Sequence, residues 1–321
     1  MTRPLFPRPV RTAAALTASG ALLLGGSAVA AAGPMDAFTG SLATASSALG
    51  SSQPAETVTT GRFASVDNFR DVAGDGGDGY ALPDGTHMQQ GVFYRSNQLV
   101  GVSDEDMAKL NALGITTVYD LRTDGDIALP MVGGADEVPE GAGYVRLPID
   151  SGNLMLDIAG NPDLGIEPKV TTPEEGRNYM EAMYVKFVEN ADSRAQFGTL
   201  LTDLAENDDP QVFHCTSGKD RTGWTAMLLQ HIAGADDATI LKDYLATNDY
   251  SATSIQKTLA GLENYGLDPD TVRPLLVVDE SYLDAGLAAV EENYGSIDNY
   301  LTEGLGLDDD TIATLRDKLV A

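Results

Sequence analysis

One segment of the chain, residues 211–224, brings together side chains that could carry out chemistry on a phosphate group. Its central residues are Cys215, Thr216, Ser217, Gly218, Lys219, Asp220, Arg221 and Thr222. A short loop wrapped around a helix N-terminus points backbone N–H groups inward and adds the positive end of the helix dipole, so it binds an anion of phosphate size. The same field stabilises a thiolate, the nucleophilic form of cysteine. The spacing therefore predicts Cys215 as a nucleophile inside a phosphate-binding loop.

The neighbours of Cys215 have definite roles in such a loop. Gly218 permits a turn that a Cβ would hinder. Arg221 can hold two phosphate oxygens with its planar guanidinium. The Thr222 hydroxyl can donate to the sulfur when the thiolate must leave again. The residues expected to bind the substrate are Thr216, Ser217, Gly218, Lys219, Asp220 and Thr222.

The first 30 residues have the composition of an export signal. Three arginines precede a stretch rich in Ala and Leu, and Ala28-Val29-Ala30 offers a small-x-small cleavage site. A permanent membrane anchor is disfavoured because glycines, serines and a threonine interrupt the stretch. We expect residues 1–30 to be a cleaved signal peptide, residues 31–60 to be a flexible linker, and the protein to be secreted. Cys215 is the only cysteine, and its neighbours favour a reactive thiol over a buried, inert one.

The charge balance excludes several classes of partner. Lys and Arg total 20 against 48 Asp and Glu, which gives a formal net charge of −28. A surface this acidic repels nucleic acid and anionic lipid, so we expect no nucleic-acid partner and no stable membrane insertion after cleavage. A function that handles phosphate then needs a local cationic pocket, which Lys219 and Arg221 can supply.

The apolar pattern indicates an α/β domain that begins near Gly61. Short β-like runs at 92–94, 115–121, 144–149 and 211–214 alternate with stretches of helical periodicity. One helix is expected after Ser103, an N-cap with Asp106 in capping-box spacing. Another is expected over residues 197–204, where apolar side chains recur at i, i+3, i+4 and i+7. The pattern predicts a central sheet, mostly parallel, flanked by helices.

The signature His214-Cys215-x5-Arg221-Thr222-Gly223 resembles that of the cysteine-dependent protein tyrosine phosphatases, and in particular their secreted bacterial branch. Further motifs similar to that branch are Asn68-Phe69-Arg70-Asp71-Val72, Tyr94-Arg95-Ser96, Tyr119-Asp120-Leu121-Arg122, Asp243-Tyr244-Leu245 and Tyr294-Gly295-Ser296. The likeness covers nearly all of residues 61–321, which we expect to be the phosphatase domain. It implies hydrolysis of phosphomonoesters through a cysteinyl-phosphate on Cys215, with a phosphorylated protein or another phosphoester as substrate and with no metal or cofactor.

Three carboxylates are candidates for the acid that protonates the leaving oxygen. The chain has no Trp-Pro-Asp loop, because its single tryptophan lies in the helix predicted after the phosphate-binding loop. The resemblance assigns the role to Asp120 at a strand end, with Asp150 and Asp220 as alternatives. Asp126 departs from the family's motif, which more often has Glu at this position, and we expect the difference to matter little.

The substrate class stays open at this point. Lys219 could recognise a second phosphate, so phosphoinositides stand beside phosphotyrosine and phosphoserine or phosphothreonine. Residues 251–284 resemble the helical lid of the bacterial branch and could shield Cys215 from oxidants. A pseudophosphatase that binds phosphorylated ligands without turnover is one alternative. Chemistry of the rhodanese or arsenate-reductase kind is another, disfavoured by the Arg-Thr-Gly ending of the loop and the lack of resolving cysteines.

Overall fold

The computed structural model describes residues 62–129, 133–152, 157, 169–262 and 267–321, so the expected signal peptide and linker lie outside the described residues. In the described part of the chain, one five-stranded sheet has the order β1-β2-β5-β3-β4. Its strands are β1 (Arg70–Asp71), β2 (Phe93–Ser96), β3 (Thr117–Asp120), β4 (Gly143–Arg146) and β5 (Gln211–His214). β1 runs antiparallel to β2 and the other neighbours are parallel. The expected mostly parallel sheet is confirmed.

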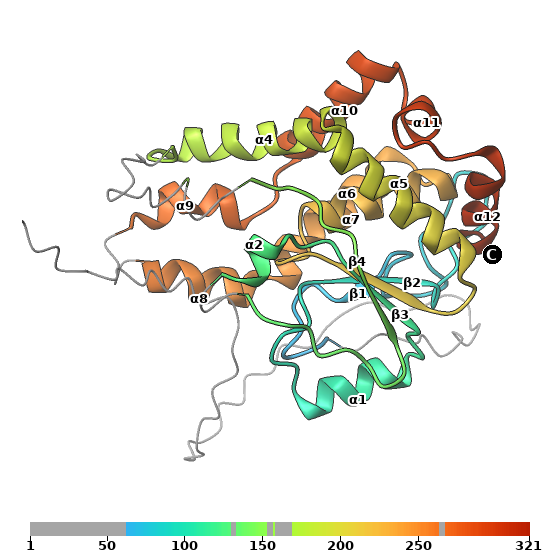
Figure 1. Cartoon of the computed structure of the whole chain (residues 1–321), viewed down its shortest axis with the longest axis horizontal. Helices are drawn as coiled ribbons and strands as arrows, with labels where there is room; N and C mark the ends of the chain where they lie inside the picture. The colour runs from blue at the N-terminus through green and yellow to red at the C-terminus, as the bar shows by residue number, and fades with distance from the viewer. Residues whose placement is uncertain (1–61, 130–132, 153–156, 158–168, 263–266) are drawn as a thin grey trace, which may run out of the picture.

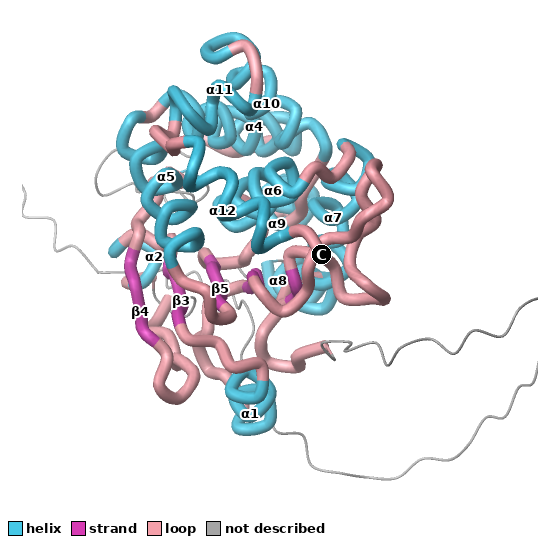
Figure 2. Tube along the Cα trace, turned by 90° about the vertical axis from the view of Figure 1, so that its right-hand side faces the viewer, coloured by secondary structure: helices cyan, strands magenta, loops and turns pink. Residues whose placement is uncertain are grey.

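Helices flank this sheet on both faces. They are α1 (Asp104–Ala112), α2 (Asp124–Ile127), α4 (Pro173–Glu189), α5 (Ala191–Glu206), α6 (Arg221–Ala233), α7 (Asp237–Tyr250), α8 (Ala252–Leu262), α9 (Pro269–Leu276), α10 (Glu280–Tyr294), α11 (Ile297–Asn299), the π-helix η3 (Tyr300–Gly304) and α12 (Asp309–Leu319). Figures 1 and 2 show α1 below the strands and α5, α6 and α12 above them. The helix expected after Ser103 is α1, and the Ser103 side chain accepts the Asp106 N–H at 3.2 Å as an N-cap.

The strands contribute to two hydrophobic cores, one on each face of the sheet. Successive side chains of a strand point to opposite faces. On β5, Val212 therefore packs in the smaller core between the sheet and α1, and Phe213 packs in the larger core with the other helices. On β3, Val118 likewise packs in the smaller core and Tyr119 in the larger core. The larger core contains Trp224 of α6, whose side chain is fully buried.

The parallel strands end together, which decides where a ligand can bind. His214 at the end of β5 is in register with Ser96 of β2 and with Asp120 of β3, and Asp120 is in register with Arg146 of β4. The loops that follow these residues therefore leave the sheet at one edge. In open α/β sheets, ligands bind at this carboxyl edge.

The segment expected to form a helical lid is helical where the structure describes it. Helices α8 and α9 belong to it. α9 packs against α4 and α8 packs against α9, and Figure 1 shows both to the left of the sheet. Within the described residues, no helix combines the length and the apolar character that crossing a membrane requires.

Candidate active site

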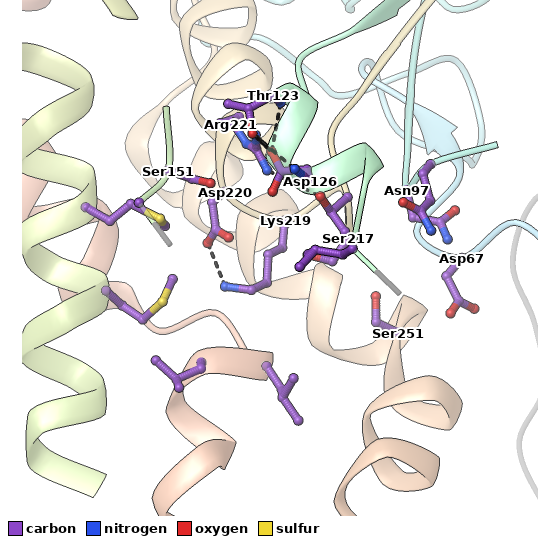
Figure 3. Close-up of a pocket in the computed structure, with 18 of the residues that line it drawn as sticks. Asp67, Asn97, Thr123, Asp126, Ser151, Ser217, Lys219, Asp220, Arg221 and Ser251 are labelled. Atoms are coloured by element: carbon purple, nitrogen blue, oxygen red, sulfur yellow. Dashed lines mark hydrogen bonds and ion pairs between the residues drawn. The ribbon is translucent and has the colours of Figure 1, made fainter. Parts of the chain in front are cut away.

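The carboxyl edge of the sheet opens onto a pocket of about 650 Å³, shown in Figure 3. The loop between β5 and α6 contributes Thr216, Ser217, Lys219, Asp220 and Arg221 to its lining. The apolar lining residues of α4, α8 and α9 include Met180, Met183, Ile255, Leu275 and Leu276. The pocket thus combines a polar part, which contains both basic side chains and carboxylates, with an apolar wall.

Cys215 directly follows β5 and is buried, with 1% of its surface exposed. The loop then turns sharply at Gly218, where φ is +67° and a Cβ would lie 2.2 Å from the Ser96 carbonyl oxygen. Only glycine fits this turn, as predicted. Thr222 lies in the first turn of α6, and its buried hydroxyl has no hydrogen-bond partner among the described residues. The strand–loop–helix arrangement expected around Cys215 is therefore present.

Arg221 is anchored at one end of its guanidinium. Nη1 donates to the carbonyls of Leu121 and Ile149, both at 3.1 Å, and to Asp126 Oδ2 at 2.8 Å. Nη2 lies 3.4 Å from Thr216 Oγ1. Nε is buried and has no acceptor within the described part of the chain. The guanidinium thus retains its Nε–Nη2 edge, the two-point edge that suits a phosphate.

The ion pair between Arg221 and Asp126 keeps both groups charged. Burial alone lowers the pKa of Arg221, but the negative charges of Cys215 and Asp126 outweigh burial and raise it above its usual value. Burial alone raises the pKa of Asp126, but the Arg221 charge lowers it below its usual range. Asp126 therefore holds the loop arginine, a role that the sequence analysis did not assign to it. Its signal in the sequence is the capping box with Thr123, which places Asp126 at the start of α2.

A buried polar cluster lies behind Cys215. His214 Nδ1 is 3.1 Å from the Cys215 carbonyl oxygen, and His214 Nε2 is 3.2 Å from Asp136 Oδ2. Arg122 Nη2 lies 2.6 Å from the same carboxylate oxygen. Although burial raises the pKa of Asp136, the adjacent His214 and the charge of Arg122 lower it below its usual range. The cluster therefore ties the residue before the nucleophile to two further loops.

The structure places Asp120 in this cluster and away from the pocket lining. Its fully buried carboxylate accepts from Arg122 Nε at 2.9 Å and from Tyr144 Oη at 2.5 Å. The Asp-x-Arg turn at the end of β3 folds the Arg122 guanidinium back onto Asp120. An acid for the leaving group has to reach the substrate, and this position does not provide that access.

Asp120, Asp136 and His214 also have the composition of a metal site. Their ligand atoms lie within 4.8 Å of one another. Arg122, however, forms ion pairs with both carboxylates, at 2.9 Å to Asp120 and 2.6 Å to Asp136. The guanidinium therefore offsets one of the two negative charges and already lies within ion-pair distance of both carboxylates.

The two alternative acids, Asp150 and Asp220, both line the pocket. Asp150 is exposed, accepts the Gly152 N–H at 2.8 Å and forms no ion pair with any described residue. Asp220 Oδ1 accepts from Lys219 Nζ at 2.7 Å and from Tyr184 Oη at 3.1 Å. Lys219 and Asp220 thus form an ion pair. Their charges cancel, so the pair adds no net positive charge to the pocket.

The fold and this loop define a phosphatase of the cysteine-dependent class. A sequence model described as the tyrosine phosphatase family matches residues 62–321, which include every described element from β1 to α12. The chain belongs to the tyrosine phosphatase family.

Bacterial relatives agree with this membership. A protein of Cupriavidus necator named as a tyrosine-protein phosphatase is 32% identical over 265 residues, which cover 81% of this chain and 88% of that protein. The triple specificity protein phosphatase PtpB of Mycobacterium tuberculosis is 28% identical over 79% of this chain and 96% of its own. Among solved structures, TpbA of P. aeruginosa aligns over 58% of this chain and 86% of its own, at 18% identity and a TM-score of 0.25.

Proposed function

We propose that the protein hydrolyses phosphotyrosine in proteins through a cysteinyl-phosphate on Cys215. The thiolate sulfur attacks phosphorus, the bond from phosphorus to the tyrosyl oxygen breaks, and that oxygen takes a proton from an acid. Water then attacks phosphorus and gives a proton to the carboxylate, while the sulfur–phosphorus bond breaks to release inorganic phosphate and the thiolate. The observation that carries the proposal is the Nε–Nη2 edge of Arg221, which is anchored at the pocket six residues after Cys215 in the sequence.

In this proposal the acid is Asp150 rather than Asp120. Asp150 is exposed and lines the pocket, whereas Asp120 is fully buried beneath it. Asp126 is a poor proton donor, because its ion pair with Arg221 holds the pKa of this carboxyl below its usual range. Asp220 is engaged by Lys219 at 2.7 Å. Asp150 lines the pocket, is exposed and has no ion-pair partner among the described residues, so its carboxyl is free to reach the leaving oxygen.

The pocket supports an aromatic phosphoester as the substrate. A cavity of about 650 Å³ exceeds what a phosphate group alone occupies, and its apolar wall can contact a tyrosine ring. A phosphoinositide is the second candidate, since Lys219 lies in the lining. The ion pair of Lys219 with Asp220 offsets the positive charge that a second phosphate would need, so phosphotyrosine is favoured.

Comparing hydrolysis rates of a phosphotyrosine peptide, a phosphoserine peptide and a phosphoinositide tests this assignment. We expect the phosphotyrosine peptide to give the highest kcat/KM. A higher kcat/KM for the phosphoinositide would indicate that lipids, and not phosphotyrosine proteins, are the preferred substrates. Phosphate binding without release of phosphate from para-nitrophenyl phosphate would indicate a pseudophosphatase instead.

We also propose that the protein is secreted. The support is the composition of residues 1–30, with basic residues followed by an apolar stretch and the Ala28-Val29-Ala30 sequence. N-terminal sequencing of the protein from the culture medium should give a chain that begins at Ala31. Retention of Met1 on a protein that stays in the cells would contradict the proposal.

A further inference from the structure

Carbonyl groups of the phosphate-binding loop are bound from behind by two side chains that do not line the pocket. Asn68 Nδ2 donates to the Gly218 carbonyl at 2.7 Å and lies 3.5 Å from the Ser217 carbonyl oxygen. Arg95 Nη2 donates to the Gly218 carbonyl at 2.9 Å. Asn68 and Arg95 are 1% and 0% exposed, so water does not compete for these bonds.

A third carbonyl of the loop is bound by a backbone group, since Thr216 accepts the Gln98 N–H at 3.1 Å. In a planar trans peptide the N–H of one residue points away from the C=O of the residue before it. The bonds to the Ser217 and Gly218 carbonyls therefore turn the following N–H groups, those of Gly218 and Lys219, away from Asn68 and Arg95, and the bond to Thr216 fixes the direction of the Ser217 N–H. Thr216, Ser217 and Lys219 of this loop line the pocket.

The two donors are themselves fixed by an acidic residue of α7. Asp243 accepts from Arg95 Nη1 at 2.9 Å and from Arg70 Nε at 2.8 Å. Arg70 Nη1 in turn donates to Asn68 Oδ1, which leaves the amide nitrogen of Asn68 to face the loop. Burial alone raises the pKa of Asp243, but Arg70 and Arg95 lower it below its usual range, so the carboxylate is charged.

The backbone at Asn68 adopts an uncommon conformation. Its φ is +58°, and no other non-glycine residue of the described chain has a positive φ. This region disfavours L-residues, although asparagine tolerates it better than most. Strained backbone persists where surrounding contacts determine it, often at functional sites. Here the contacts are those that aim the Asn68 amide at the loop.

We propose that Asn68 and Arg95 are positioning residues, which hold the loop peptides so that the N–H groups of Gly218 and Lys219 face the bound phosphate. Asp243 acts through Arg95. The inference rests on the proposed function, because it assumes that this loop binds the phosphate of the substrate.

Two substitutions of Asn68 test the proposal in the full chain. Asn68→Asp keeps the size of the side chain and tolerates the positive φ, but an ionised carboxylate cannot donate to the carbonyls. Asn68→Gly accommodates the same φ without strain and removes the side chain altogether. Gln230→Glu is the matched control, because Gln230 Nε2 donates to the Val72 carbonyl at 2.9 Å in a buried bond of the same kind outside the loop.

Three measurements are made on each variant: binding of inorganic phosphate by calorimetry, the rate of Cys215 alkylation at one fixed pH, and thermal unfolding. We expect both Asn68 variants to bind phosphate at least about tenfold more weakly, since misaimed anion donors lose most of their effect. Their Cys215 should also be alkylated more slowly than in the wild type, because the same N–H groups stabilise the reacting thiolate. Gln230→Glu should unfold at a lower temperature and keep both other properties.

The proposal is overturned if the Asn68 variants lower only the unfolding temperature and bind phosphate within about twofold of the control, which is the pattern of a purely structural bond. Failure of the proposed function looks different. In that case the wild type itself would not bind inorganic phosphate or release it from para-nitrophenyl phosphate.

Discussion

The Arg221 guanidinium and the Asp126 carboxylate form an ion pair of 2.8 Å, although 95 residues separate them in the sequence. The pair joins the first residue of α6 to α2, which follows β3. It fixes one end of the guanidinium and leaves the Nε–Nη2 edge for the substrate. The proposed geometry of phosphate binding therefore depends on a residue of another element, the short helix α2.

Asp126→Ala should lower kcat/KM for para-nitrophenyl phosphate by about tenfold to a hundredfold, because small displacements of a positioned group are costly in catalysis. Asp126→Glu should retain most of the activity, since a carboxylate remains to hold Arg221. Steady-state kinetics measures both. Asp124→Ala is the control, because Asp124 lies on the same short helix but is exposed and pairs with Arg146. Equal losses for Asp124→Ala and Asp126→Ala would mean that α2, and not the ion pair, is what matters.

The leaving-group dependence of the rate distinguishes the candidate acids. Asp150→Asn should slow hydrolysis of a phosphotyrosine peptide by about a hundredfold or more, within the usual contribution of general acid catalysis. The loss on para-nitrophenyl phosphate should be much smaller, because its phenolate leaves without a proton more readily than tyrosine, whose pKa is about 10. Asp120→Asn should instead reduce stability, since it removes the charge that faces Arg122 in a buried pair. If Asp120→Asn showed the leaving-group dependence, the acid would be Asp120.

Asp71 on β1 should make stability depend on pH. Burial raises the pKa of Asp71 from its ordinary 3.8 to about 7, despite backbone hydrogen bonds from Gly91 and Ala73 that lower it. The native state therefore holds a proton here that the unfolded state releases. Protonated Asp71 therefore stabilises the native state fully below about pH 4. This stabilisation, about 4 kcal/mol in all, is lost as the pH rises through about 7.

Urea unfolding of the wild type and of Asp71→Asn, across about pH 5 to pH 8, measures this contribution of Asp71 to the free energy of unfolding. The advantage in unfolding free energy of the wild type over Asp71→Asn should shrink as the pH rises. A difference between the two proteins that stays constant with pH would show that Asp71 is ionised in the native state throughout.

Chelation tests the interpretation of the buried cluster of Asp120, Asp136 and His214. Because Arg122 already pairs with both carboxylates, activity and unfolding temperature should be the same before and after dialysis against a strong chelator. Loss of either property on dialysis, with recovery on addition of a divalent ion, would make the cluster a metal site.

The local parts of the site could be predicted from the sequence. The order of Cys215, Gly218 and Arg221 between an apolar run and a helical pattern predicts the strand, the turn and the helix N-terminus. The structure has β5, a positive φ at Gly218 and α6 starting at Arg221. The capping spacing after Ser103 likewise predicts α1. These features depend on neighbouring residues, which the sequence displays directly.

The contacts between distant residues could not be predicted in this way. Asn68 and Gly218 are 150 positions apart, and only the pairing of β1, β2 and β5 brings them together. The sequence did contain a signal that Asp120 is the partner of a buried ion pair, because Arg122 follows two residues later and is close enough to pair with it. Helix α4 also had a signal that was missed, the capping box of Thr172 and Glu175 with Pro173 at the first helical position.

The central claim, that Cys215 carries the phosphoryl group, is tested most directly by trapping the intermediate. The enzyme is mixed with para-nitrophenyl phosphate, stopped in denaturant during turnover, digested and analysed by mass spectrometry. The account predicts one added phosphoryl group on the peptide that contains Cys215, and none in Cys215→Ser. Turnover without phosphate on this peptide, or phosphate on a different residue, would contradict it.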